Sequence, residues 1–304
     1  MLENYEPEGP AEIVDVDIRA WVETARPNPL QYRNRQVTEI VLATIGLTPS
    51  LSTTLVLKGG ALMALAFKSE RVTGDVDFSA SAGPADFDKL LVKEFNAQFP
   101  KVAIQLGYLD LICRVQKVEK RPRPQNFENM DFPALLVRIG SAIRGTPEQK
   151  RLEAGQATRV VDVEISFRDQ VCQFQELNLT DAGAAVRAFT IHEIIAEKIR
   201  ALLQQVGRNR YRRQDVYDIA FLLDIYPMDD ADLAQIHATL VEKCATRGIV
   251  PAAHSIADSE VRRRAEADWN TLKLELAELP PFDERYARLE AFYARLPWAQ
   301  STET

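Results

Sequence analysis

The sequence contains little cysteine, little histidine and no long apolar run. Only 3 cysteines and 3 histidines occur in 304 residues, and Cys113, Cys172 and Cys244 lie far apart. This excludes a disulfide framework or a zinc-finger pattern and favours reduced, buried thiols in the cytoplasm. Because no apolar run reaches about 18 residues, we expect no membrane span. The acidic, proline-containing start MLENYEPEGP also predicts no secretory signal.

The charge balance excludes a surface that is basic throughout. The chain has 37 Lys and Arg against 44 Asp and Glu, which gives a net charge of −7. A protein whose whole surface binds nucleic acid by charge would be strongly basic, so nucleic-acid binding would have to use local basic clusters. With 46% hydrophobic and 27% charged residues, the chain has the composition of one large globular domain or two smaller ones.

The hydrophobic pattern changes along the chain from mixed to helical. Residues 1–50 have helical spacing, TLVLKGG predicts a strand and a tight turn before a helix, and GDVDFSA predicts a strand followed by another helix. Strand patterns dominate from residue 101 to 180, and helical patterns follow after residue 190. We therefore predict an α+β fold with a mixed sheet in residues 1–185 and an all-helical domain in residues 186–304.

Two carboxylates stand one residue apart in the predicted strand GDVDFSA. Since side chains alternate along a strand, Asp75 and Asp77 share one face, while Val76 and Phe78 share the other. Adjacent carboxylates repel each other, and a cation such as Mg²⁺ would compensate them. A solvated strand edge or a turn would produce the same short pattern.

Two further features suggest a nucleotide site. Lys58, Gly59 and Gly60 lie at a predicted junction of strand and helix, where free backbone N–H groups can bind phosphate, although an ordinary turn has the same residues. The strand VVDVEISF has an apolar face and a polar face that carries Asp162, Glu164 and Ser166. We favour Glu164 as a third carboxylate, and Asp162 remains an alternative, as does a half-exposed structural strand.

The helical part places charged residues on apolar faces. Lys198 falls within the apolar stripe of the helix IHEIIAEKIRALLQQV, and Asp215 lies in the buried arc of the next helix. The two residues can form a structural ion pair that sets how the helices dock. Alternatively, Lys198 binds nucleotide phosphates and Asp215 orients it or an acceptor hydroxyl. The two roles are compatible.

Three segments together resemble the AbiEii/AbiGii-type nucleotidyltransferase toxins of the DNA polymerase β-like superfamily. They are LVLKGGALMALAF with RVTGDVDFS, then VVDVEISFRD, and then HEIIAEKIRALL with RYRRQDVYDIAFLL. The resemblance implies a polymerase β-like core in which Asp75, Asp77 and Glu164 hold Mg²⁺. It also implies that Lys198 binds the NTP phosphates and that Asp215 is an essential acid.

The resemblance extends to the predicted nucleotide-binding residues. These are Lys58, Gly59, Gly60, Arg71, Thr73 and Lys198. The chain departs from the wider superfamily at Ala61, where many members have Ser or Thr, and at Gln214, where a basic residue often precedes the aspartate. Phosphate binding would therefore depend on backbone N–H groups and the two lysines.

The family implies a toxin that transfers NMP from an NTP to an acceptor hydroxyl. Such enzymes belong to toxin–antitoxin or phage-defence systems, and some extend the 3′ end of tRNA, so a cognate antitoxin is an expected partner. An arginine cluster just before Asp215 is predicted to bind RNA; it comprises Arg208, Arg210, Arg212 and Arg213.

Three alternatives remain at this point. The acceptor hydroxyl can belong to a protein, or the chain can be an inert module that binds a partner. A glycosyltransferase interpretation of Asp75 and Asp77 leaves Lys198 and Asp215 without a role.

Overall fold

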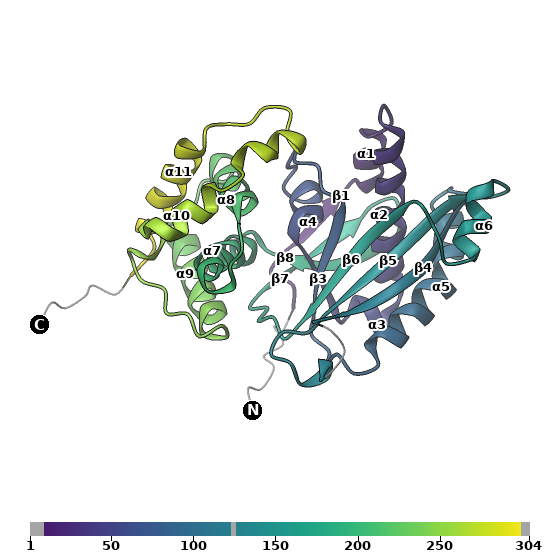
Figure 1. Cartoon of the computed structure of the whole chain (residues 1–304), viewed down its shortest axis with the longest axis horizontal. Helices are drawn as coiled ribbons and strands as arrows, with labels where there is room; N and C mark the ends of the chain where they lie inside the picture. Colours follow the sequence, from purple (N-terminus) through teal and green to yellow (C-terminus); the bar gives the residue numbers. More distant parts are fainter. Residues whose placement is uncertain (1–8, 123–125, 299–304) are drawn as a thin grey trace, which may run out of the picture. The chain divides into compact units, whose positions relative to one another are not determined.

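The computed structural model describes residues 9–122 and 126–298 (Figure 1). Within these ranges the chain divides into two compact units. The first, here called the sheet unit, comprises residues up to Ala66 and Thr73–Phe189. The second, the helical unit, comprises Phe67–Val72 and the residues from Thr190 onward. The short segment before the strand with the paired aspartates therefore belongs to the helical unit, which its sequence did not indicate.

The sheet unit contains an eight-stranded mixed sheet in the order β1-β7-β8-β2-β3-β6-β5-β4. Pairing is parallel for β1 with β7, β2 with β8 and β3 with β6, and antiparallel for the other neighbours. The described strands are β1 (Ile13–Val16), β2 (Leu55–Lys58), β3 (Asp75–Ala80), β4 (Leu111–Arg121), β5 (Ala134–Ile143), β6 (Val160–Phe167), β7 (Phe174–Leu179) and β8 (Ala184–Phe189). The predicted α+β class with a mixed sheet is confirmed.

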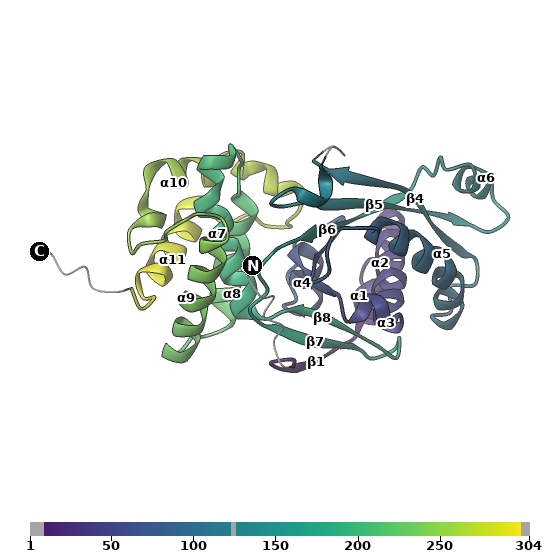
Figure 2. The ribbon, with the colours of Figure 1, turned by 90° about the horizontal axis from the view of Figure 1, so that it is seen from below.

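Helices α2 and α5 lie along one face of the sheet, as Figure 2 shows. The α-helices described in this unit are α1 (Ile18–Glu23), α2 (Pro29–Leu47), α3 (Pro49–Ser52), α4 (Gly59–Leu65), α5 (Phe87–Gln105) and α6 (Pro147–Glu153). Helix α2 starts where Asn28 accepts hydrogen bonds from the backbone N–H groups of Leu30 and Gln31, with Pro29 at the first helical position. The ring of Phe87 in α5 packs edge to face against the ring of Phe167, with 5.4 Å between the ring centroids.

The two faces of β6 have opposite character. Val161, Val163, Ile165 and Phe167 are buried, and Asp162, Glu164 and Ser166 between them are partly exposed. Because Phe167 packs on α5, the apolar face of β6 is the one that the helices cover. The predicted alternation is correct, and it leaves the acidic residues on the opposite face.

The helical unit is built from five α-helices within the described residues. They are α7 (Ile191–Arg208), α8 (Arg213–Ile225), α9 (Asp230–Ala245), α10 (Ser259–Glu266) and α11 (Phe282–Ala294). The hydroxyl of Thr190 caps the start of α7, and Asn209 ends it in a left-handed conformation at φ 50°. Short 3₁₀ turns stand at Ser255–Ala257 and Trp269–Leu274, and a third lies in the sheet unit at Phe127–Asn129.

Several predicted elements were wrong. Residues 1–50 contain the strand β1, which has only 4 residues and is held by parallel pairing with β7, a contact that no local pattern encodes. Helix α5 continues to Gln105, into the region predicted as strand, and β8 was not predicted. The segment RPNPLQY, which contains two prolines, includes the first turn of α2, since Pro29 tolerates that position.

Within the described ranges, the helices are too short or too polar to cross a lipid bilayer.

Candidate active site

The acidic residues of β3 and β6 lie in register on one face of the sheet. In the parallel pairing of these strands, Asp75 is opposite Asp162 and Asp77 is opposite Glu164. Neighbouring strands are about 4.8 Å apart, so four carboxylates occupy adjacent positions in two strands. The sequence predicted the face of each strand, and the register shows that the two acidic faces adjoin.

Asp75 interacts with both candidate third carboxylates. Asp75 is exposed at the start of β3. Partial desolvation of its carboxyl raises its pKa, and the negative charges of Asp162 and Glu164 raise it further. The choice between Asp162 and Glu164 therefore stays open. Among the residues that the structure describes, no three His, Cys, Asp or Glu side chains are grouped closely enough to hold a metal ion. The carboxylate oxygens of β3 and β6 are donors that suit a hard cation, but their side chains are spread along the two strands.

Gly59 makes room for the Asp77 carboxylate. The turn between β2 and α4 places Gly59 at φ +68°, in the left-handed region that glycine adopts without strain. A Cβ atom at this position would lie 2.0 Å from Oδ2 of Asp77. Lys58, the preceding residue, pairs with Asp77 across the β2–β3 ladder. The glycine is thus required both for the turn and for the position of the acid.

Lys58 is held by a polar network that includes a residue missed in the sequence analysis. Its Nζ donates to Oδ2 of Asp169 and to Oγ of Ser166, each at 2.6 Å. The same Asp169 oxygen accepts from Ser79 at 3.1 Å and from Ser166 at 2.6 Å. Asp169 follows β6 in the segment SFRD, and its place after the acidic strand was the only signal available. Lys58 is therefore tied to the end of β6, beside Asp77 and Gly59.

In the helical unit, Lys198 lies between two aspartates. Its Nζ donates to Oδ1 of Asp215 at 2.9 Å and to Oδ2 of Asp218 at 2.8 Å. Burial opposes the charged ammonium, but the carboxylates of Asp215 and Asp218 hold the pKa of Lys198 above its usual value. The ion pair with Asp215 that the two helices suggested is present. Asp218, which is fully buried, is an additional partner of Lys198.

Asp215 uses only one of its oxygens in a hydrogen bond. Oδ1 accepts from Lys198, whereas the buried Oδ2 has no hydrogen-bond partner and has Arg212 Nη1 at 3.8 Å as a salt-bridge neighbour. A buried oxygen without a donor is costly, so such an atom is a candidate to accept a hydrogen bond from a ligand. This arrangement is compatible with the predicted role for Asp215.

Arg71 is engaged by acidic residues of the helical unit. Its Nε and Nη2 donate to the two oxygens of Asp218, each at 3.0 Å, and Nη1 donates to Glu275 at 2.8 Å. Burial opposes the carboxylate form of Asp218, but Lys198 and Arg71 lower its pKa below the usual range. Most Arg71 donors are therefore occupied, and nucleotide binding by this residue stays a prediction. Thr73, in the sheet unit, donates to the backbone of Asp75 at 3.4 Å.

The predicted RNA-binding arginines surround the turn between α7 and α8. Arg208 and Arg210 are exposed, whereas Arg212 and Arg213 are half-buried at the start of α8. They thus lie beside Asp215 in sequence and in the same unit. Gly60 is half-buried in the first turn of α4.

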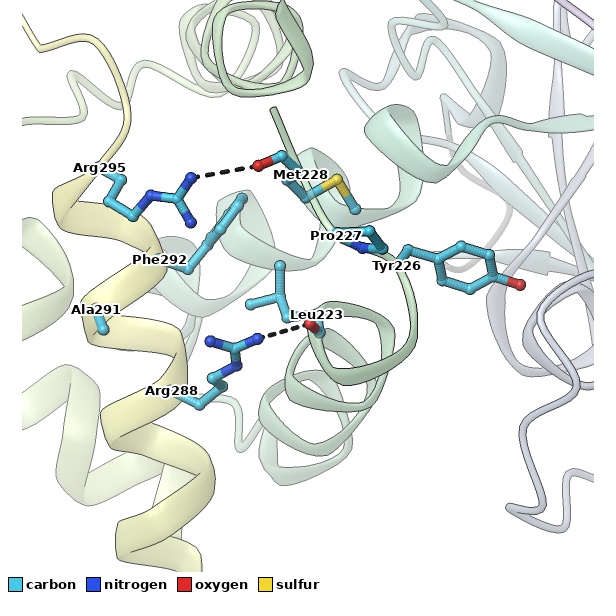
Figure 3. A pocket seen from close by; sticks show the side chains of 8 residues that line it. All are labelled: Leu223, Tyr226, Pro227, Met228, Arg288, Ala291, Phe292 and Arg295. Carbon is cyan, nitrogen blue, oxygen red and sulfur yellow. Dashed lines mark hydrogen bonds between the residues drawn. The ribbon is translucent and has the colours of Figure 1, made fainter. Parts of the chain in front are cut away.

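A pocket in the helical unit lies apart from these residues. It has a volume of about 240 Å³ and is lined by the ends of α8 and α11 (Figure 3). Arg288 and Arg295 border it but donate to the backbone carbonyls of Leu223 and Met228 at 2.7 and 3.3 Å. None of the predicted site residues lines it, so it is not the candidate active site.

Comparison with known proteins identifies the family. The family model described as the nucleotidyl transferase AbiEii toxin of type IV toxin–antitoxin systems matches residues 41–293. A search of curated proteins finds no match. Among solved structures, the chain resembles JHP933 from Helicobacter pylori, with 16% identity, a TM-score of 0.51, and coverage of 88% of this chain and 91% of that one.

A second solved structure has a similar fold. MenT4, a nucleotidyltransferase toxin from Mycobacterium tuberculosis H37Rv, shares 14% identity, with a TM-score of 0.52 and coverage of 91% of this chain and 88% of that one. At these identities the structures support the fold, and the family model covers most of the sequence. The chain therefore belongs to the AbiEii family of nucleotidyltransferase toxins of type IV toxin–antitoxin systems.

Proposed function

We propose that this nucleotidyltransferase uses Mg²⁺ to transfer NMP from an NTP to the 3′ hydroxyl of a tRNA. The observation that carries the proposal is the adjoining acidic faces of β3 and β6, where Asp75 has a raised pKa beside Asp162 and Glu164. Like charges placed together on a sheet face cost stability, and a function that uses a cation explains why they are there.

The metal-binding role is proposed for Asp75, Asp77 and Glu164. Their carboxylates are hard oxygen donors of the kind Mg²⁺ prefers. When bound, Mg²⁺ would lower the pKa of the acceptor hydroxyl and neutralise negative charge on the triphosphate. Gly59 and the Lys58–Asp169 pair keep the turn next to Asp77 in place before substrate arrives.

In the proposed reaction, the acceptor oxygen forms a bond to the α-phosphorus. The bond between the α-phosphorus and the bridging oxygen breaks, and pyrophosphate leaves. Lys198 is the proposed ligand of the phosphates, and the hydroxyl proton passes to Asp215, whose Oδ2 has no hydrogen-bond donor. Arg208 and Arg210 are exposed and are proposed to bind the RNA backbone.

The biological setting follows from the family. An antitoxin partner is implied by the type IV system, and we propose action in the cytoplasm and in defence against phage. A protein hydroxyl is the competing acceptor.

The test uses an Asp77→Asn variant with labelled NTPs and an extract of total RNA and protein. Loss of one metal-binding carboxylate is expected to cost several kcal/mol of transition-state stabilisation, about a thousandfold in rate, without unfolding the chain. Asp110→Asn, at an exposed position of the same unit, serves as the control. Label in RNA supports the proposal, label in protein favours the competing acceptor, and an undiminished rate in Asp77→Asn contradicts the site.

A further inference from the structure

The acidic face of β3 and β6 continues into strands that carry cations. In the register of the sheet, Arg138 of β5 is opposite Asp162, and Lys117 of β4 is opposite Arg138. Arg121 of β4 is opposite Ala134, which is itself opposite Ser166. Lys117, Arg121 and Arg138 therefore lie on the same face as Asp162 and Glu164. We call these three residues the basic row.

The basic row is exposed, and Glu119 of β4 lies on the same face. Lys117 is bound to Glu119 at 2.8 Å, whereas the two arginines are only loosely neutralised. The side chains of Lys117, Arg121 and Arg138 are 60%, 49% and 41% exposed. Arg138 lies 3.7 Å from Asp162 and 3.6 Å from Glu119. Arg121 lies 3.7 Å from Glu164 and 4.0 Å from Glu119, and all four distances are longer than a hydrogen bond. Lys58, by comparison, is 16% exposed and bound to Asp169 at 2.6 Å. The two guanidinium groups therefore keep donors that a phosphate can use.

We infer that the basic row binds successive backbone phosphates of the acceptor RNA strand, an inference that rests on the proposed function. Lys117 and Arg121 are four positions apart, which spans about 13 Å along a strand. This distance suits several nucleotides of one strand better than a single triphosphate. Because β5 is adjacent to β6, a strand bound here runs beside the carboxylates, where its 3′ end would react.

Lys120, next to Arg121 in β4, does not belong to the basic row. It points to the opposite face of β4, where its Nζ lies 5.3 Å from the centroid of the Phe127 ring and 3.4 Å from Asp88 of α5. Alternation along β4 thus separates Lys120 from Lys117 and Arg121. The row also differs from the arginines around the turn between α7 and α8, which belong to the helical unit.

The experiment measures binding of a fluorescein-labelled single-stranded RNA oligonucleotide to the full chain without NTP. The double variant Arg121→Gln, Arg138→Gln is expected to bind about tenfold more weakly. Two lost phosphate contacts should also reduce the slope of log K against log salt by about 1.4. The control is Lys89→Gln, Lys93→Gln, which removes the same charge from exposed positions of α5 on the other face of the sheet, and should bind as the parent does.

NTP binding and transfer are measured in parallel. We expect the double variant to keep the NTP affinity of the parent chain. RNA binding and a salt slope equal to those of the parent would overturn the inference, and so would weaker NTP binding with unchanged RNA binding. If the parent chain binds RNA through the row but transfers no nucleotide, the inference stands and the proposed function fails.

Discussion

Acidic residues occur in two contrasting settings in this protein. On the face of β3 and β6, Asp75 lies exposed beside two other carboxylates, and its pKa is raised. In the helical unit, Asp218 is fully buried between Lys198 and Arg71, and its pKa is lowered. The first arrangement opposes the charged form of its acid, and the second favours it.

This difference indicates a binding role for the acids on the face of β3 and β6 and a structural role for Asp218. Like charges that lie side by side on an accessible face reduce stability and can be compensated by a ligand. Buried opposite charges that satisfy each other hold elements together, and removal of one member leaves the others uncompensated. We therefore expect substitutions in the two settings to change stability in opposite directions.

The largest effect is expected for Asp218→Ala. This change leaves Lys198 and Arg71 buried with a lost partner, so the free energy of unfolding should fall by about 3–5 kcal/mol. Urea denaturation measures the loss, and Asp230→Ala, at an exposed position of the same unit, should change little. A loss below about 1 kcal/mol in Asp218→Ala would show that the buried cluster is not what stabilises the helical unit.

A smaller effect is expected for Gly59→Ala. The new Cβ would collide with the Asp77 carboxylate, and alanine is strained at φ +68°, so we expect a loss of about 1–3 kcal/mol and reduced transfer. Gly83→Ala is the matched control, because no atom lies within 4 Å of its added Cβ and its φ is not positive. Equal stability of the two variants would mean that the turn does not constrain Asp77.

The smallest effect concerns the pH dependence contributed by Asp75. A raised pKa means that the folded chain holds this proton more tightly than the unfolded chain, so stability falls as pH rises from the ordinary value of 3.8 through the raised one. Without divalent cations, Asp75→Asn should remove that fall and stabilise the protein at neutral pH by about 0.5 kcal/mol, since the site is partly exposed.

Thermal unfolding of parent and variant across this pH range tests the expectation. Asp110→Asn, at an exposed position, should leave the profile unchanged. Lower stability of Asp75→Asn at neutral pH would show that Asp75 is favourably paired, against the contrast drawn between the two settings.

The main strands and their polar faces could be predicted because alternation is local. The residues 75–78 and 161–167 carry the pattern in consecutive positions, and the structure has both strands with the expected buried side chains. The apolar stripes also identified α7 and α8 and the charges within them. By contrast, Asp169 reaches Lys58 across 111 residues, and Asp218 reaches Arg71 across 147, so no local pattern could pair them.

Local periodicity sets which residues face the core and which acids share a strand face, because side-chain period is a property of each strand or helix. The neighbours of these side chains depend on how the strands and helices pack. The order of strands placed β6 between β3 and β5, so that carboxylates adjoin carboxylates on one side and arginine on the other. Packing of the helical unit decided that Lys198 meets two aspartates, since burial leaves a charge stable only where an opposite charge is packed against it.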